Sequence, residues 1–176
     1  NVSETKFEEL RNVISEHLSG RAERLLVFTE HKDTLDFLIG KLTNLGFHCC
    51  TIHGGMALEK RIAAEREFFE RCPSVMVATE AAGEGINLQF CSLMVNYDIP
   101  WNPNRLEQRM GRIHRYKQQQ EAMIFNLVAE NTREGEVMHC LLRKLEDMRR
   151  ALGSDRVYDV IGEIVPAPKF DSLMKD

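Results

Sequence analysis

The chain contains 176 residues, of which 43% are hydrophobic and 28% are charged. These fractions are close to those of globular proteins, and they exclude a disordered, collagen-like or low-complexity chain. The formal net charge of -4 excludes a uniformly basic surface, so any contact with nucleic acid requires a local basic patch. The length fits one compact domain.

Neither the cysteines nor the apolar segments indicate secretion or a membrane. The five cysteines are odd in number and include no C-x-x-C pair and no histidines at zinc-ligand spacing, so we expect reduced, mostly buried thiols and no metal site. The chain has no apolar run of about 18 residues and does not open with a charged segment followed by an apolar one. We therefore expect a cytoplasmic protein, associated with the nucleoid if it is bacterial.

Strands and helices are predicted to alternate along the chain. An amphipathic helix closed by Gly20 precedes a strand at Leu25 to Phe28 and a helix that ends at Gly46. Further strands are predicted over residues 48–52, 75–79, 93–97 and 122–128, with helices over 57–71, from Asn102-Pro103 through the basic segment, and over 134–152. Strict alternation predicts an α/β fold with a parallel sheet and helices on both faces.

The C-terminal tail differs in composition from the rest of the chain. From Gly153 it contains Pro166 and Pro168 and loses helical periodicity. We therefore predict one domain over residues 1–152, followed by a strap or linker over residues 153–176.

Three loops that follow predicted strands contain small or polar residues. They are Thr29 to His31, His53 to Gly55 and Thr79 to Asn87. Ligands of open parallel sheets bind beyond the carboxyl ends of the strands, where glycines allow backbone N–H groups to approach an anion. Each loop taken alone is better explained as a turn. A dinucleotide-binding loop is disfavoured, because Leu88 occupies the position of its third glycine.

The segment from Gln108 to Arg115 is the most specific signal in the sequence. On a helix, Arg112 and Arg115 would project from one side of a turn, where they could neutralise charge on a transferred phosphoryl group. A solvated basic helix would explain the charges of the patch from Arg105 to Lys117, but not the presence of Gln108 and Gly111. No P-loop motif occurs in the chain, so an arginine finger here makes sense if another domain or chain supplies the P-loop.

Four collinear segments between about residues 20 and 130 resemble motifs IV to VI of superfamily 2 helicases. They are LLVFT at residues 25–29, HGGM at 53–56, VATEAAGEGINL at 77–88 and QRMGRIHR at 108–115. Residues 96–98 and 100–103 resemble the Swi/Snf-type branch, in the style of the bacterial RNA-polymerase-recycling ATPase. The chain departs from this branch at Lys117, which replaces the usual glycine before Gln118.

The resemblance implies the C-terminal RecA-like lobe of a two-lobed motor, with a P-loop NTPase-like fold. ATP and Mg²⁺ would be bound mainly by an N-terminal RecA-like lobe of the same protein. Arg115 would act as the arginine finger, Arg112 would contact the γ-phosphate and Gln108 would reach the nucleotide. Gly85 and Asn87 would border it.

The resemblance also implies a grip on nucleic acid. Thr29, Gly54 and Thr79 would hold phosphates of one strand through hydroxyl and backbone N–H groups, which position a nucleic acid without reading its sequence. The expected substrate is duplex DNA, and the expected further partner is RNA polymerase or another protein complex. The C-terminal lobe alone is expected to have no useful ATPase activity.

Two other functions remain open at this point. The lobe could belong to an enzyme that separates strands of DNA or RNA instead of moving along a duplex. It could also be a non-catalytic module that binds nucleic acid or a protein through the patch from Arg105 to Lys117. Binding of phosphates through such a patch would weaken steeply as the salt concentration rises.

Overall fold

The computed structural model describes residues 2–18, 24–80, 88–100, 102–113 and 122–129, together with Gly135, Glu136, Cys140 and Arg143. The chain divides into two compact units, one formed by residues 1–99 with 109–127 and the other by residues 100–108 with 128–176. Within the described ranges, no helix is long and apolar enough to cross a membrane.

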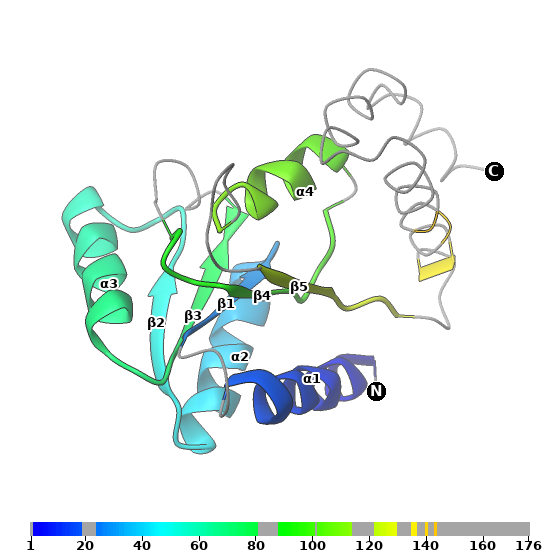
Figure 1. Cartoon of the computed structure of the whole chain (residues 1–176), viewed down its shortest axis with the longest axis horizontal. Helices are drawn as coiled ribbons and strands as arrows, with labels where there is room; N and C mark the ends of the chain where they lie inside the picture. Colours follow the sequence, from blue (N-terminus) through cyan, green and yellow to red (C-terminus); the bar gives the residue numbers. More distant parts are fainter. Residues whose placement is uncertain are drawn as a thin grey trace. The chain divides into compact units, whose positions relative to one another are not determined.

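Five parallel strands form one sheet in the first unit, in the order β2-β3-β1-β4-β5 (Figure 1). They are β1 (Arg24–Thr29), β2 (His48–Ile52), β3 (Ser74–Thr79), β4 (Leu93–Asn96) and β5 (Met123–Asn126). The central strands β1, β3 and β4 are almost completely buried, as expected for parallel strands that are covered on both faces. The predicted parallel sheet and all five predicted strands are confirmed.

Helices cover both faces of this sheet. One face is packed by α1 (Val2–Val13), its π-helical continuation η1 (Ile14–Leu18) and α2 (Lys32–Asn44), whose apolar side chains surround Val27 and Val77. The other face is packed by α3 (Leu58–Glu70), whose Phe68 contacts a cluster that includes Leu26 and Met76. Two separate apolar cores therefore hold the sheet between helices, which confirms the predicted α/β architecture.

The predicted end of α2 at Gly46 is also confirmed. Gly46 has a φ of +86°, which only glycine adopts at little cost. Its N–H donates to the carbonyl of Thr43 at 2.9 Å, and the N–H of Phe47 donates to the carbonyl of Leu42 at 3.1 Å. This pair of bonds is the Schellman arrangement, and it satisfies the last carbonyls of the helix before β2 begins.

The helix predicted through the basic segment is shorter than expected. The helix α4 spans Pro103–Met110, and residues 111–113 form a turn in which the N–H of Arg112 donates to the carbonyl of Arg109 at 3.0 Å. Gly111 disfavours helix continuation, and the burial of Ile113 draws the chain inward. The prediction that Arg112 lies on a helix is therefore wrong. Gly20, most of 134–152 and all of 153–176 lie outside the described residues.

The C-terminal end of α3 is fixed to the sheet by Arg24. The guanidinium of Arg24 donates from Nε to the carbonyl of Phe68 at 3.0 Å, donates from a second nitrogen to the carbonyl of Phe69, and lies over the ring of Phe90. Bonds from a charged donor contribute about 1.5–3 kcal/mol each. Because Arg24 is partly exposed, its replacement with alanine is expected to cost less than the sum of both bonds, about 2–3 kcal/mol in the free energy of unfolding measured by urea denaturation.

The matched control for this experiment is Arg66→Ala on the same helix. Arg66 is exposed, and its one ion pair with a described residue is with Glu70, one turn away, at 2.7 Å. Its replacement should leave the urea midpoint within error of the wild type, because exposed pairs of this kind add little stability. An equal loss in both variants would mean that Arg24 does not anchor α3.

Candidate functional site

The loops singled out in the sequence meet at one edge of the sheet. Thr29 and Thr79 are direct register partners at the carboxyl ends of β1 and β3, and Ile52 at the end of β2 pairs with Ala78. The turn from His53 to Gly55 follows immediately. The structure thus brings Thr29, Gly54 and Thr79 to the edge at which ligands of open parallel sheets bind.

The side chain of Thr29 forms a hydrogen bond inside the domain. Its side chain is fully buried, and its hydroxyl donates to Oδ2 of Asp98 at 2.5 Å. In this conformation the hydroxyl therefore has a charged acceptor inside the domain and no access to solvent. The predicted phosphate contact of Thr29 stays a prediction, and in the structure its hydroxyl holds Asp98 in place.

Gly54 lies in an exposed and well-supported turn. The N–H of Met56 donates to the carbonyl of His53 at 3.0 Å and closes the turn. Arg61 of α3 donates to the carbonyls of Met56 and Gly54, each at 3.0 Å. With its carbonyls occupied by Arg61, the turn is held in one conformation that leaves Gly54 accessible to solvent.

The loop after β3 is described only at its start. Thr79 is buried, with 7% of its surface exposed, and Glu80 follows it. Residues 81–87 lie outside the described residues, and these include Gly85 and Asn87, the residues expected to border the nucleotide. The predicted positions of Gly85 and Asn87 therefore stay predictions.

Arg109 makes several polar contacts with the described residues at this edge. Only 2% of its surface is exposed, although the sequence placed it in a basic surface patch. Its Nη1 donates to the carbonyl of Asp98 at 2.6 Å and to Oδ1 of Asn96 at 3.3 Å. Its Nε lies 3.7 Å from Oε1 of Glu80, and its guanidinium lies over the ring of Phe28.

These contacts tie four segments together at the carboxyl edge. Phe28 belongs to β1, Glu80 follows β3, Asn96 ends β4 and Asp98 lies two residues beyond it. A buried arginine requires such partners, because an uncompensated buried charge is very costly. Arg109 therefore fixes the start of the turn at residues 111–113 against the ends of three strands.

Asp98 links this network to α1. Lys6 donates from Nζ to the carbonyl of Tyr97 at 3.0 Å and lies 3.5 Å from Oδ1 of Asp98. Asp98 thus accepts from Thr29 and Lys6 through its carboxylate and from Arg109 through its carbonyl. Three segments that are distant in sequence converge on this one residue, which stiffens the edge.

The remaining predicted site residues are placed as follows. Arg112 lies in the turn directly after the Arg109 anchor and is partly exposed. Gln108 is exposed on α4. Arg115 lies outside the described residues, and so do His114 and Lys117 of the expected basic patch. Arg109 and Asp98 stand within the sequence motifs, but the alternating order of elements does not reveal that they anchor this edge.

The thiols do not add a nucleophile to this edge. Burial is the main cause that raises the pKa of Cys50 to about 12 and of Cys91 to about 11, so both thiols stay protonated at neutral pH. The expectation of mostly buried thiols is wrong for Cys72 and Cys140, which are exposed. Among the described residues, which include all five cysteines, no disulfide forms.

Residues 5–117 match the family model of the helicase conserved C-terminal domain. The chain is 39% identical over 131 residues to an uncharacterized ATP-dependent helicase of Bacillus subtilis, covering 74% of this chain and 23% of the relative. It is 32% identical over 133 residues to the ISWI chromatin-remodeling complex ATPase ISW1 of Saccharomyces cerevisiae, covering 73% of this chain and 12% of that protein. The chain thus spans a quarter or less of the length of these curated relatives.

The fold is also similar to that of a solved ATPase domain. The crystal structure of the C-terminal part of the Fun30 ATPase domain superposes with a TM-score of 0.71 at 24% identity, covering 76% of this chain and 44% of that one. The RecA-like fold and the resemblance to Swi/Snf-type helicases are confirmed. The parallel sheet, the ordered motifs and the matched family model together show that this chain belongs to the helicase conserved C-terminal domain family.

Proposed function

We propose that this chain is the second motor lobe of an ATP-dependent translocase that moves along duplex DNA. The observation that carries the proposal is the Arg109 anchor, which fixes the segment leading to Arg112 at the carboxyl edge of a sheet in a chain without a P-loop. A rigidly held cationic segment with no nucleotide site of its own suits a lobe that completes a site on another lobe.

In this proposal the N-terminal RecA-like lobe binds ATP with Mg²⁺, and the present lobe closes over it. Arg115 supplies the arginine finger, Arg112 contacts the γ-phosphate, and Gln108 reaches the nucleotide, which Gly85 and Asn87 border. Arginine side chains that are already in position before the reaction stabilise the negative charge that develops on the γ-phosphoryl oxygens. The protein then does not need to reorganise during the reaction. The Arg109 anchor supplies that fixed position to the segment.

The same lobe would grip one strand of the duplex. Gly54 offers backbone N–H groups from its exposed turn, and Thr79 lies one strand further along the same edge. ATP binding would close the cleft, and hydrolysis would reopen it, so that alternating grips on phosphates step the motor along DNA. Duplex DNA as the track, and RNA polymerase or another protein complex as partner, are part of this proposal because of the Swi/Snf-type resemblance.

The proposal is tested by ATP turnover of the intact protein alone, with duplex DNA and with single-stranded RNA. Stimulation by duplex DNA, together with removal of the third strand from a DNA triplex and no melting of the duplex, is the expected result. Stimulation by RNA with strand separation would replace the translocase with a helicase. Salt-sensitive binding of nucleic acid without any ATP turnover would identify a binding module instead.

A further inference from the structure

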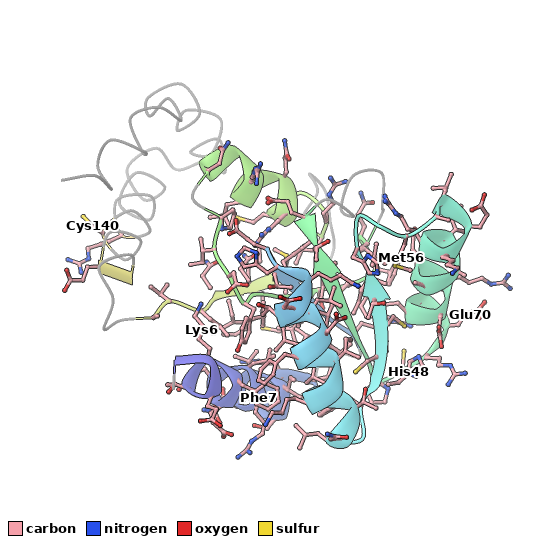
Figure 2. All side chains as sticks on the ribbon, turned by 180° about the vertical axis from the view of Figure 1, so that it is seen from behind. Lys6, Phe7, His48, Met56, Glu70 and Cys140 are labelled. Atoms are coloured by element: carbon pink, nitrogen blue, oxygen red, sulfur yellow. The ribbon has the colours of Figure 1, made fainter. Side chains whose placement is uncertain are left out.

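Three side chains with metal-binding atoms converge at the edge strand of the sheet, on the side covered by α3. His48 and Cys50 are two residues apart on β2, and strand alternation therefore places them on the same face. Glu67 lies in the last turn of α3, next to the start of β2, where Figure 2 labels His48. Each of the three residues offers one ligand atom, and these atoms lie within 4.8 Å of one another.

The two distances from Nε2 of His48 to the other ligand atoms are close to those of a tetrahedral centre. The Nε2 of His48 lies 3.7 Å from Sγ of Cys50 and 3.1 Å from Oε1 of Glu67. Zinc bonds of about 2.0 Å to nitrogen and oxygen and about 2.3 Å to sulfur, at tetrahedral angles, separate such atoms by about 3.3–3.6 Å. Shifts of a few tenths of an ångström would bring both of these pairs to that spacing, and Sγ of Cys50 already lies within 4.8 Å of the carboxylate of Glu67.

The cluster is buried on its inner side and open to solvent on its outer side. Cys50 is buried beneath α3, whereas the side chains of His48 and Glu67 are 29% and 47% exposed. An ion held by these three residues would keep its fourth position toward solvent, for a water molecule. One thiolate and one carboxylate would balance its two positive charges, so the nearby guanidinium of Arg71, 3.8 Å from Glu67, would face no net charge.

We propose that Nε2 of His48, Sγ of Cys50 and the carboxylate of Glu67 bind Zn²⁺, with water as the fourth ligand. On binding, the thiol proton of Cys50 passes to solvent, and the hydrogen of the His48 ring resides on Nδ1. The sulfur, nitrogen and oxygen donor set selects zinc over hard cations such as Mg²⁺. The ion would join α3 to β2, the two elements on either side of the turn that presents Gly54.

The sequence contains no motif that predicts this metal centre. His48 and Cys50 are separated by one residue on a strand, which is not a known metal-binding pattern. Glu67 lies seventeen residues after Cys50, and this separation matches no metal-binding motif either. Only the packing of α3 over the edge strand brings the third ligand to the other two. The expectation of no metal site rested on ligand spacing along the chain, which does not detect a centre of this kind.

Cobalt and zinc titrations of the purified protein test the proposal. The two exposed cysteines are first replaced, as Cys72→Ser with Cys140→Ser, so that the remaining thiols are Cys49, Cys50 and Cys91. Co²⁺ should then produce a thiolate-to-metal charge-transfer absorption and tetrahedral d–d bands at one ion per chain. Zn²⁺ should abolish both signals and raise the melting temperature.

Variants in the same background assign the ligands. Cys50→Ser should remove the charge-transfer absorption, and Glu67→Gln and His48→Gln should each weaken Co²⁺ affinity at least about tenfold. His31→Gln, at an exposed histidine outside the cluster, is the matched control and should change nothing. Should Cys50→Ser fail to fold, Glu67→Gln still decides, because Glu67 is largely exposed. Unchanged Co²⁺ affinity in Glu67→Gln, or no charge-transfer absorption in the background protein, would overturn the proposal.

Discussion

Replacement of Arg115 with alanine in the intact protein is expected to lower DNA-stimulated ATP turnover by about 10³- to 10⁵-fold. This loss corresponds to about 4–7 kcal/mol of transition-state stabilisation. The guanidinium would contact the γ-phosphoryl group only as charge develops during transfer, so the variant should lose kcat more than affinity for ATP. The measurement is steady-state ATP turnover at saturating duplex DNA, together with DNA binding in the absence of nucleotide.

The control for this prediction is Arg66→Ala, which removes an exposed arginine from α3. It should leave both kcat and KM near the wild-type values, which shows that general loss of surface charge is not the cause. DNA binding without nucleotide should be unchanged in Arg115→Ala. If ATP turnover of Arg115→Ala stays within a few-fold of the wild type, Arg115 is not the finger and the proposed role of this lobe fails.

The strands could be predicted from the sequence because a strand that is buried on both faces consists of consecutive apolar residues. A central parallel strand such as β1 is a continuous apolar run, since neither of its faces meets water. The glycine that ends α2 is equally local, because Gly46 adopts a φ of +86° that other residues avoid. Features of this kind depend on neighbours in the chain, and a single sequence therefore suffices to locate them.

The candidate site could not be predicted to the same depth. Arg109 was expected on the surface because arginine is usually exposed, but its partners lie 11 and 13 residues away at the end of β4. The hydroxyl of Thr29 was expected to be accessible, yet it meets Asp98 across 69 residues. Inward or outward orientation of a polar side chain depends on such distant partners, which periodicity does not encode.

Replacement of Arg109 with alanine is expected to lower the free energy of unfolding by about 3–5 kcal/mol, the usual cost of removing one partner from a buried ion pair. The variant takes the cation away from Glu80, 3.7 Å from the guanidinium, and removes the donor to the carbonyl of Asp98. It also removes the contact of the guanidinium with the ring of Phe28. Urea denaturation followed by circular dichroism measures this loss.

A lysine at the same position separates charge from geometry. Arg109→Lys keeps the positive charge beside Glu80, but a single ammonium lacks the planar fork that reaches Asp98 and Asn96 while lying over Phe28. We expect Arg109→Lys to recover part of the stability lost in Arg109→Ala, yet to restore little ATP turnover in the intact protein. In the proposed mechanism, turnover would need the turn that carries Arg112 in one position, whereas stability would need mainly the buried charge to be paired. If Arg109→Lys restored turnover and stability in proportion, Arg109 would act on activity through folding alone, and the anchor would not position the segment that leads to the finger.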